Sequence, residues 1–146
     1  MGIPTLWYNF CLPAGRQAQA QKVRIWEAGG GHLQADELAR KIIDVLSDKQ
    51  AEDILLLDIR SVASFADYFV IASAETVRQT QAILDAVDHE LERDGTRPQG
   101  REGKPDSGWV LLDYGDVIVH LFAPEEREYY DLEGLWHTAT PVVRIQ

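Results

Sequence analysis

The sequence predicts an α+β domain, a mixed sheet of four or five strands flanked by helices. Stretches with helical and with strand periodicity alternate along the chain, and two of the strand-like stretches are joined by only a tight turn. With 146 residues, of which 45% are hydrophobic, the chain can bury one modest core but not a second full domain. We therefore expect a single folded domain.

The first half of this domain is expected to hold one helix and two strands. The helix begins near Ala35, and Asp36 is placed to cap its start. Its apolar residues recur at helical spacing, namely Leu38, Ile42, Val45 and Leu46. The apolar run Ile54 to Ile59, which polar residues bound on both sides, indicates a buried strand, and Tyr68 to Ala72 indicates a second.

A second helix is expected after these strands. Thr76 and Gln79 have the spacing of a capping box, and Gly95 is placed to end the helix. One face of this helix carries Thr80, Ile83, Leu84, Val87 and Leu91. The stretch from Arg97 to Gly108 is rich in glycine, proline and charge, and it predicts a loop.

The clearest strand pattern in the sequence is a hairpin. Trp109 to Asp113 and Val117 to Phe122 are strand-like, and the three residues 114 to 116 suit a tight antiparallel turn. Alternation places Trp109 and Tyr114 on opposite sides, and both sides carry apolar groups. Three helices are few for covering both faces of the sheet, so we expect an apolar area to be left uncovered. Such an area would form a protein-binding patch. The alternatives are that the N-terminal segment or a second copy of the chain covers it.

A short final helix is expected after the hairpin. Pro124 suits a first helical turn, and the carboxylates that follow favour the positive end of the helix dipole. The residues expected on this helix are Tyr129, Tyr130, Leu132, Leu135 and Trp136. We expect Trp136 and one of the two tyrosines in the core, whereas Trp109 and Tyr114 are the better candidates for an interface.

Charge is distributed unevenly along the chain. Residues 1 to 33 hold three basic residues and one acidic residue, whereas residues 34 to 146 hold eleven basic and twenty-three acidic residues. Nucleic-acid binding depends on cationic side chains that neutralise phosphates, so this body should be repelled by RNA and DNA. The composition therefore favours a protein partner, although acidity that serves only solubility would look the same.

The N-terminal segment differs from the rest. Residues 1 to 32 show no sustained periodicity, and the triplet Gly29 to Gly31 predicts a flexible boundary, so we expect an extension followed by a domain over residues 33 to 146. The only cysteine is Cys11, which excludes an intrachain disulfide. No apolar stretch reaches the ~20 residues of a membrane span, and no secretory leader is evident. A bacterial cytoplasmic protein is expected, with an organellar location as the alternative.

Residues for catalysis or metal binding are sparse. The four histidines are scattered, at His32, His89, His120 and His137. Asp113 and Asp116 flank the hairpin turn and could hold Mg²⁺, but such residues more often bond to turn amides. His120 shares a side of its strand with apolar residues, which is typical of a structural or interface histidine. We expect no metal, no cofactor and no enzymatic activity.

Several strings of residues resemble the ribosomal silencing factor family, also called Iojap-related. These strings are Ala66 to Ser73 (ADYFVIAS), Arg78-Gln79, Glu102-Gly103, Trp109 to His120 (WVLLDYGDVIVH) and Tyr130 to Trp136 (YDLEGLW). The resemblance runs from about Leu33 to Trp136, and the hairpin string and the Tyr-Asp-Leu-Glu string are long and specific. Residues 1 to 32 lie outside it.

The resemblance implies a domain related to the nucleotidyltransferase fold that binds the large-subunit ribosomal protein L-fourteen. Bound there, the factor would block joining of the small subunit and lower translation when nutrients are scarce. Catalysis is not implied, because Ser73-Ala74 stands where enzymes of that fold have Gly-Ser, and the sequence has no Asp-x-Asp pair. The alternatives are a homodimeric adaptor and a nucleotidyltransferase that uses Asp113 and Asp116.

The family's partner-binding hairpin maps onto a group of mostly aromatic residues in the C-terminal third. The expected partner-binding residues are Trp109, Tyr114, Asp116 and His120, with Tyr129, Tyr130 and Leu132 as neighbours. A few aromatic anchors dominate most protein interfaces. An acidic body would also be attracted to a basic ribosomal protein.

Overall fold

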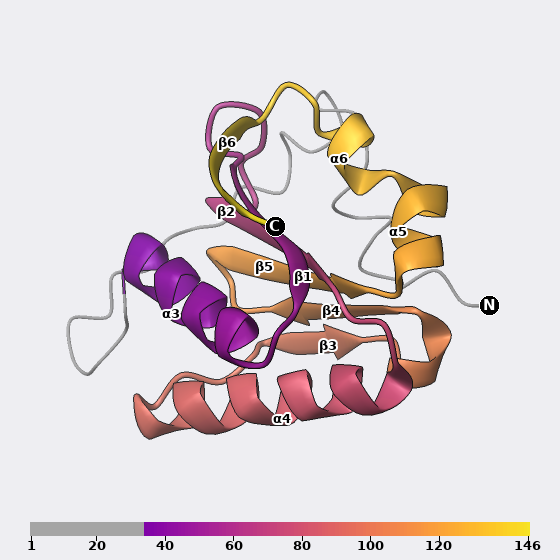
Figure 1. The fold of residues 1–146 in the computed structure, drawn as a ribbon. Helices are drawn as coiled ribbons and strands as arrows, with labels where there is room; N and C mark the ends of the chain where they lie inside the picture. Colours follow the sequence, from indigo (N-terminus) through magenta and orange to yellow (C-terminus); the bar gives the residue numbers. More distant parts are fainter. Residues whose placement is uncertain (1–33) are drawn as a thin grey trace.

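The computed structural model describes residues 34–146, which form one mixed sheet with helices on both faces (Figure 1). In chain order the elements are α3 (Ala35–Asp48), β1 (Glu52–Asp58), β2 (Tyr68–Ser73), α4 (Val77–Arg93), β3 (Gly100–Glu102), the 3-10 turn η1 (Pro105–Ser107), β4 (Trp109–Asp113), β5 (Val117–Phe122), α5 (Pro124–Tyr130), α6 (Leu132–Leu135) and β6 (Thr140–Ile145). This confirms the predicted α+β class. The predicted extension over residues 1 to 32 lies outside the described residues.

The sheet has the strand order β3-β4-β5-β2-β1-β6. The pair β2 and β5 is parallel, and every other neighbouring pair is antiparallel. The parallel pair requires a crossover, and α4 lies within that connection (Figure 1). Four or five strands were predicted and six are present within residues 34–146, because β3 and β6 were not anticipated.

Two hydrophobic cores lie on the two faces of the sheet. On one face, alternate strand residues such as Val70, Leu112 and Val119 pack with α3 and α4. On the other face, residues such as Phe69 and Leu111 pack with the segment that contains α6. Figure 1 shows α3 and α4 on one side of the sheet and α5 and α6 on the other. The predicted alternation along the hairpin is therefore confirmed, and so are the hairpin strands themselves.

The start of α3 differs from the prediction. The helix begins at Ala35, so Gln34 is the capping residue and makes no side-chain bond to the helix. Asp36 lies inside the first turn, where its charge favours the positive end of the helix dipole instead of capping an amide. The four apolar residues predicted to face the core are all buried: Leu38, Ile42, Val45 and Leu46.

Both ends of α4 agree with the prediction. The Thr76 hydroxyl accepts a hydrogen bond from the Gln79 amide at 3.0 Å. The Gln79 side chain reaches back to accept from the Glu75 amide, one residue before the cap, also at 3.0 Å. The helix ends at Arg93, and Gly95 follows with a φ of +76°, which glycine adopts at little cost. Among residues 34–146, no helix is long and apolar enough to cross a bilayer.

The predicted final helix is split into two. Asp131 adopts a φ of +43° and ends α5, and its carboxylate then accepts a hydrogen bond from the Gly134 amide at 3.1 Å to cap α6. The stretch predicted as a loop also contains β3 and η1. Strand β6 escaped prediction because all six of its residues are exposed at the edge of the sheet, so it lacks a buried alternation.

Replacing Gly103 with alanine is expected to lower the free energy of unfolding by about 2–3 kcal/mol. Gly103 has a φ of +85°, and a Cβ atom there would overlap the backbone oxygen of Trp109. Gly95→Ala is the matched control, because Gly95 has a similar φ but nothing within 4 Å of its added Cβ. Urea denaturation of both variants measures the difference, and equal losses would show that the close approach to Trp109 has no energetic weight.

Candidate functional site

The predicted partner-binding residues are divided between core and surface. The buried side chains are those of Trp109, Tyr114, His120 and Leu132. Asp116 and Tyr130 are partly exposed. Tyr129 is 82% exposed and is the most accessible of the seven. In this structure a partner could touch Tyr129, Tyr130 and Asp116 directly, whereas the other four side chains are covered.

The two aromatic residues favoured for an interface lie in different cores. Trp109 packs on the α6 side of the sheet, and Tyr114 packs on the side covered by α4. Burial raises the pKa of the Tyr114 phenol, and the nearby Asp88 carboxylate adds to the effect. One continuous patch containing both side chains is therefore absent from the described domain. The sequence pattern placed them on opposite sides of the hairpin but could not show that both sides are covered.

An aromatic column connects the second core to the surface. Phe122 on β5 contacts Trp109 with ring centroids 4.7 Å apart, and Trp109 contacts Tyr130 at 4.8 Å. Tyr130 in turn meets Tyr129 edge to face at 5.0 Å. We call these four residues the aromatic column. The buried half of the column supports the exposed half, so the Tyr129 ring rests on a packed base.

His120 lies beside this column and is fully buried. Its Nδ1 atom accepts a hydrogen bond from the Trp109 indole at 3.2 Å. The neutral ring therefore carries its proton on Nε2, which has no hydrogen-bond partner among residues 34–146. Burial lowers the pKa of His120 from 6.5 to about 3. A histidine held neutral and enclosed in this way supports the core and is unsuited to exchanging protons with a substrate.

The accessible part of the site is the outer surface of the two short helices. Tyr129 and the half-exposed Leu135 supply apolar area. The exposed carboxylates of Glu125, Glu128 and Asp131 belong to the same two helices and their junction. We call these five residues the α5–α6 surface. Aromatic and aliphatic groups next to carboxylates suit a protein partner that presents apolar and cationic side chains.

The two aspartates that flank the hairpin turn make structural bonds, Asp113 through its side chain and Asp116 through its backbone. The Asp113 carboxylate accepts a hydrogen bond from the Gly115 amide at 2.7 Å, as an aspartate in a turn commonly does. The Asp116 carbonyl oxygen accepts from the amides of Asp67 and Tyr68 at 2.8 and 3.0 Å. Within residues 34–146, no three His, Cys, Asp or Glu side chains come together as metal ligands would.

A nearly buried arginine, Arg127, is the main feature that the sequence did not reveal. The Arg127 side chain is 10% exposed and bonds to two strands and to α6. Its partners are the Asp53 carbonyl and carboxylate, the Ser73 hydroxyl and the Glu133 carboxylate. In the sequence it is one charge in the run of charged residues around it, and no local pattern marks it as buried.

Known proteins share this arrangement of strands and helices. Residues 32–146 match the family model described as "Ribosomal silencing factor during starvation". The chain belongs to this family. The predicted resemblance is therefore confirmed over nearly all of the described residues.

Relatives of this silencing factor occur in bacteria and in organelles. Ribosomal silencing factor RsfS of Bacillus subtilis is 44% identical over 92 residues, which cover 63% of this chain and 78% of the relative. The chloroplastic protein Iojap of Zea mays is 35% identical over 96 residues, covering 66% and 42%. A mouse protein named "Mitochondrial assembly of ribosomal large subunit protein 1" is 28% identical over 127 residues, covering 85% and 56%.

Two solved structures resemble this silencing factor. The crystal structure of a Chromobacterium violaceum protein superposes with a TM-score of 0.69 at 32% identity, covering 78% of this chain and 95% of that one. The crystal structure of a Bacillus halodurans protein gives a TM-score of 0.63, also at 32% identity, covering 76% and 98%. The relation to nucleotidyltransferases stays a prediction.

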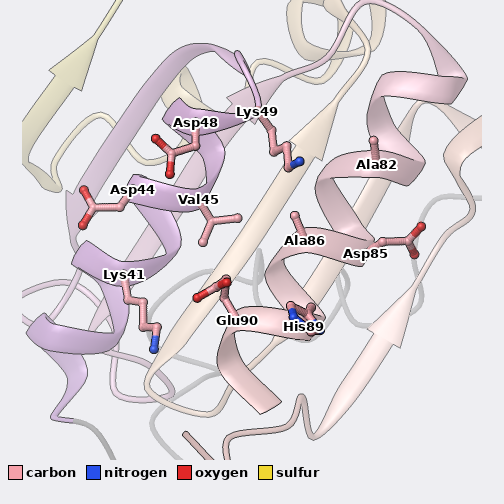
Figure 2. A pocket seen from close by; sticks show the side chains of 10 residues that line it. All are labelled: Lys41, Asp44, Val45, Asp48, Lys49, Ala82, Asp85, Ala86, His89 and Glu90. Atoms are coloured by element: carbon pink, nitrogen blue, oxygen red, sulfur yellow. The ribbon is translucent and has the colours of Figure 1, made fainter. Parts of the chain in front are cut away.

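A groove also runs between α3 and α4 of this silencing factor, on the face of the sheet opposite the α5–α6 surface (Figure 2). It is an open groove with a volume of about 710 Å³. Figure 2 shows Val45 and Ala86 pointing into it, and Glu90 reaching across it. Lys41 on its rim forms an ion pair with Asp94. The groove combines a small apolar floor with charges of both signs.

Proposed function

We propose that this chain binds the large ribosomal subunit through ribosomal protein L-fourteen and sterically blocks joining of the small subunit. Protein synthesis in a bacterial cytoplasm would then fall under nutrient limitation. Membership of the ribosomal silencing factor family gives the chain a ribosome-associated silencing role. The mouse relative's name refers to the large subunit, which supports that subunit as the target. The role is regulatory, and we propose no catalytic step.

The observation that carries this proposal is the exposed end of the aromatic column. Tyr129 projects from α5 with most of its ring in solvent, and Tyr130 packs against it from below. A tyrosine side chain has few rotatable bonds and so loses little conformational entropy when a partner covers it, which is typical of an interface anchor. The carboxylates of the α5–α6 surface would attract a cationic ribosomal protein and repel the surrounding RNA phosphates.

A second candidate is a homodimer off the ribosome, and one observation favours it. Strand β6 forms an edge of the sheet, and Val142, Val143 and Ile145 on it are all more than a third exposed. An exposed apolar edge strand can pair with a strand of another chain. Light scattering at micromolar concentration decides this candidate, because a monomer there would exclude it.

The Tyr129→Ala variant is expected to weaken binding of L-fourteen by roughly tenfold or more, as loss of an aromatic anchor does. Purified L-fourteen is titrated into wild type and variant by calorimetry, and a subunit-joining assay follows. Because Tyr129 is so exposed, the variant should keep its stability to within about 0.5 kcal/mol.

Val77→Ala is the matched control for this experiment. Val77 is 54% exposed at the start of α4, on the other face of the sheet, so the same kind of truncation there should leave affinity unchanged. Failure of wild type to bind L-fourteen would overturn the proposed function. Equal binding by wild type and Tyr129→Ala would keep the function and reject the α5–α6 surface.

A further inference from the structure

Helix α5 carries the most exposed aromatic residue of the site but has little apolar anchorage. No residue of α5 is buried, and α6 buries only Leu132. A helix of seven residues is also too short to be stable alone. Its position on the sheet therefore depends on one ring contact, Tyr130 against Trp109 at 4.8 Å, together with specific polar contacts.

Arg127 supplies these polar contacts. Its Nη1 atom donates to the Asp53 carbonyl at 2.7 Å on β1 and to the Ser73 hydroxyl at 2.9 Å on β2. Its Nε atom donates to the Glu133 carboxylate at 2.7 Å on α6. One nearly buried guanidinium thus joins α5 to two strands of the sheet and to the next helix.

The sheet is locally shaped to receive this arginine. The pairing of β1 with β2 shifts register between Glu52 and Leu55, and Asp53 within this irregularity has a φ of +45°. A bulge of this kind removes a backbone carbonyl from the regular ladder and redirects it. The Asp53 carbonyl bonds to Arg127 instead. Arg144 on β6 holds the Asp53 carboxylate with two bonds of 2.9 Å.

We propose that Arg127 is a positioning residue, which fixes α5 so that Tyr129 is presented to the partner in one orientation. This inference rests on the proposed function. Residues two apart on a helix point in different directions, so Arg127 faces the sheet while Tyr129 faces solvent. Arg127 therefore sets the geometry of the α5–α6 surface without contacting the partner.

The test compares Arg127→Met with Arg144→Met. Arg144 shares the partners Asp53 and Glu133 but lies on β6 and is nearly half exposed, so its loss removes the same charge without releasing α5. Hydrogen exchange of the amides from Arg127 to Trp136 should quicken roughly tenfold in Arg127→Met, while the amides of β2 and β5 stay protected. Arg144→Met should leave the exchange of this segment near the wild-type rate.

The association and dissociation rates of L-fourteen distinguish a positioning role of Arg127 from a contact role or a role in fold stability. If α5 is correctly placed only about a tenth of the time, the apparent association rate falls roughly tenfold and the dissociation rate stays the same. A contact residue would instead raise the dissociation rate. A residue that only stabilises the fold would leave both rates unchanged at temperatures well below the unfolding midpoint. Arg127→Lys, which keeps the charge but loses the planar fork, should give an intermediate association rate.

The outcomes distinguish a failure of this inference from a failure of the proposed function. If wild type does not bind L-fourteen, the proposed function fails and the presentation role of Arg127 falls with it, while hydrogen exchange still shows whether Arg127 holds α5. If wild type binds and Arg127→Met exchanges and associates like wild type, the positioning role is overturned. An unchanged association rate with faster dissociation would also overturn it, by showing that Arg127 touches the partner.

Discussion

Replacing Phe69 with alanine is expected to lower the free energy of unfolding by about 3–5 kcal/mol. Phe69 is the second residue of β2, one of the central strands, and is fully buried. Its ring centroid lies 4.8 Å from that of His120, 5.2 Å from that of Trp136 and 6.0 Å from that of Phe65. Alanine would leave a cavity in the second core, where strands on both sides restrict collapse.

Urea denaturation followed by circular dichroism measures this loss. Phe69→Leu keeps most of the volume and should cost less than half as much. Tyr129→Ala is the matched aromatic truncation at the surface, and it should stay within about 0.5 kcal/mol of wild type. A loss below about 1 kcal/mol for Phe69→Ala would mean that the second core repacks easily.

The parts of the fold that were predicted correctly depend on local patterns. The hairpin strands and the capped start of α4 follow from alternation, a tight turn and one hydroxyl that bonds to a nearby amide. Strand β6 depends instead on its neighbour, because it pairs with β1 at the sheet edge without burying its own residues. The break at Asp131 depends on one residue in a left-handed conformation, which an otherwise helical sequence conceals.

The sequence named residues for the candidate site, but it could not show which of them are buried. Of the aromatic site residues named from the sequence, Trp109, Tyr129 and Tyr130 come together in the aromatic column. Tyr114 lies in the other core, and the pattern could not show which ring ends in solvent. The buried Trp109 packs against Tyr130, and this contact joins residues 21 positions apart. The ion pairs of Arg127 reach back 74 positions to Asp53, beyond any local pattern. Long-range packing therefore decides which residues a partner can touch.

His120 makes the stability of the domain depend on pH. Burial lowers its pKa from 6.5 to about 3, so between these values the unfolded state binds a proton that the folded state does not. The contribution of neutral His120 to stability is therefore fully present above pH 6.5 and is lost as the pH falls. The expected loss is about 2 kcal/mol at pH 5 and roughly 4 kcal/mol at pH 3.5. Protonation would also turn Nδ1 into a donor that faces the Trp109 N–H group.

His120→Phe is expected to remove this acid sensitivity, because phenylalanine fills similar space among the aromatic rings and cannot be protonated. Between pH 7.5 and 5, measured in urea, the free energy of unfolding of wild type should fall by about 2 kcal/mol relative to that of the variant. The matched control is His89→Phe, which changes an exposed histidine on α4 and should leave the slope as in wild type. Parallel curves for wild type and His120→Phe would mean that water or a local opening lets the buried imidazole titrate in the folded state. His120, beside the aromatic column, would then be less tightly packed than the structure indicates.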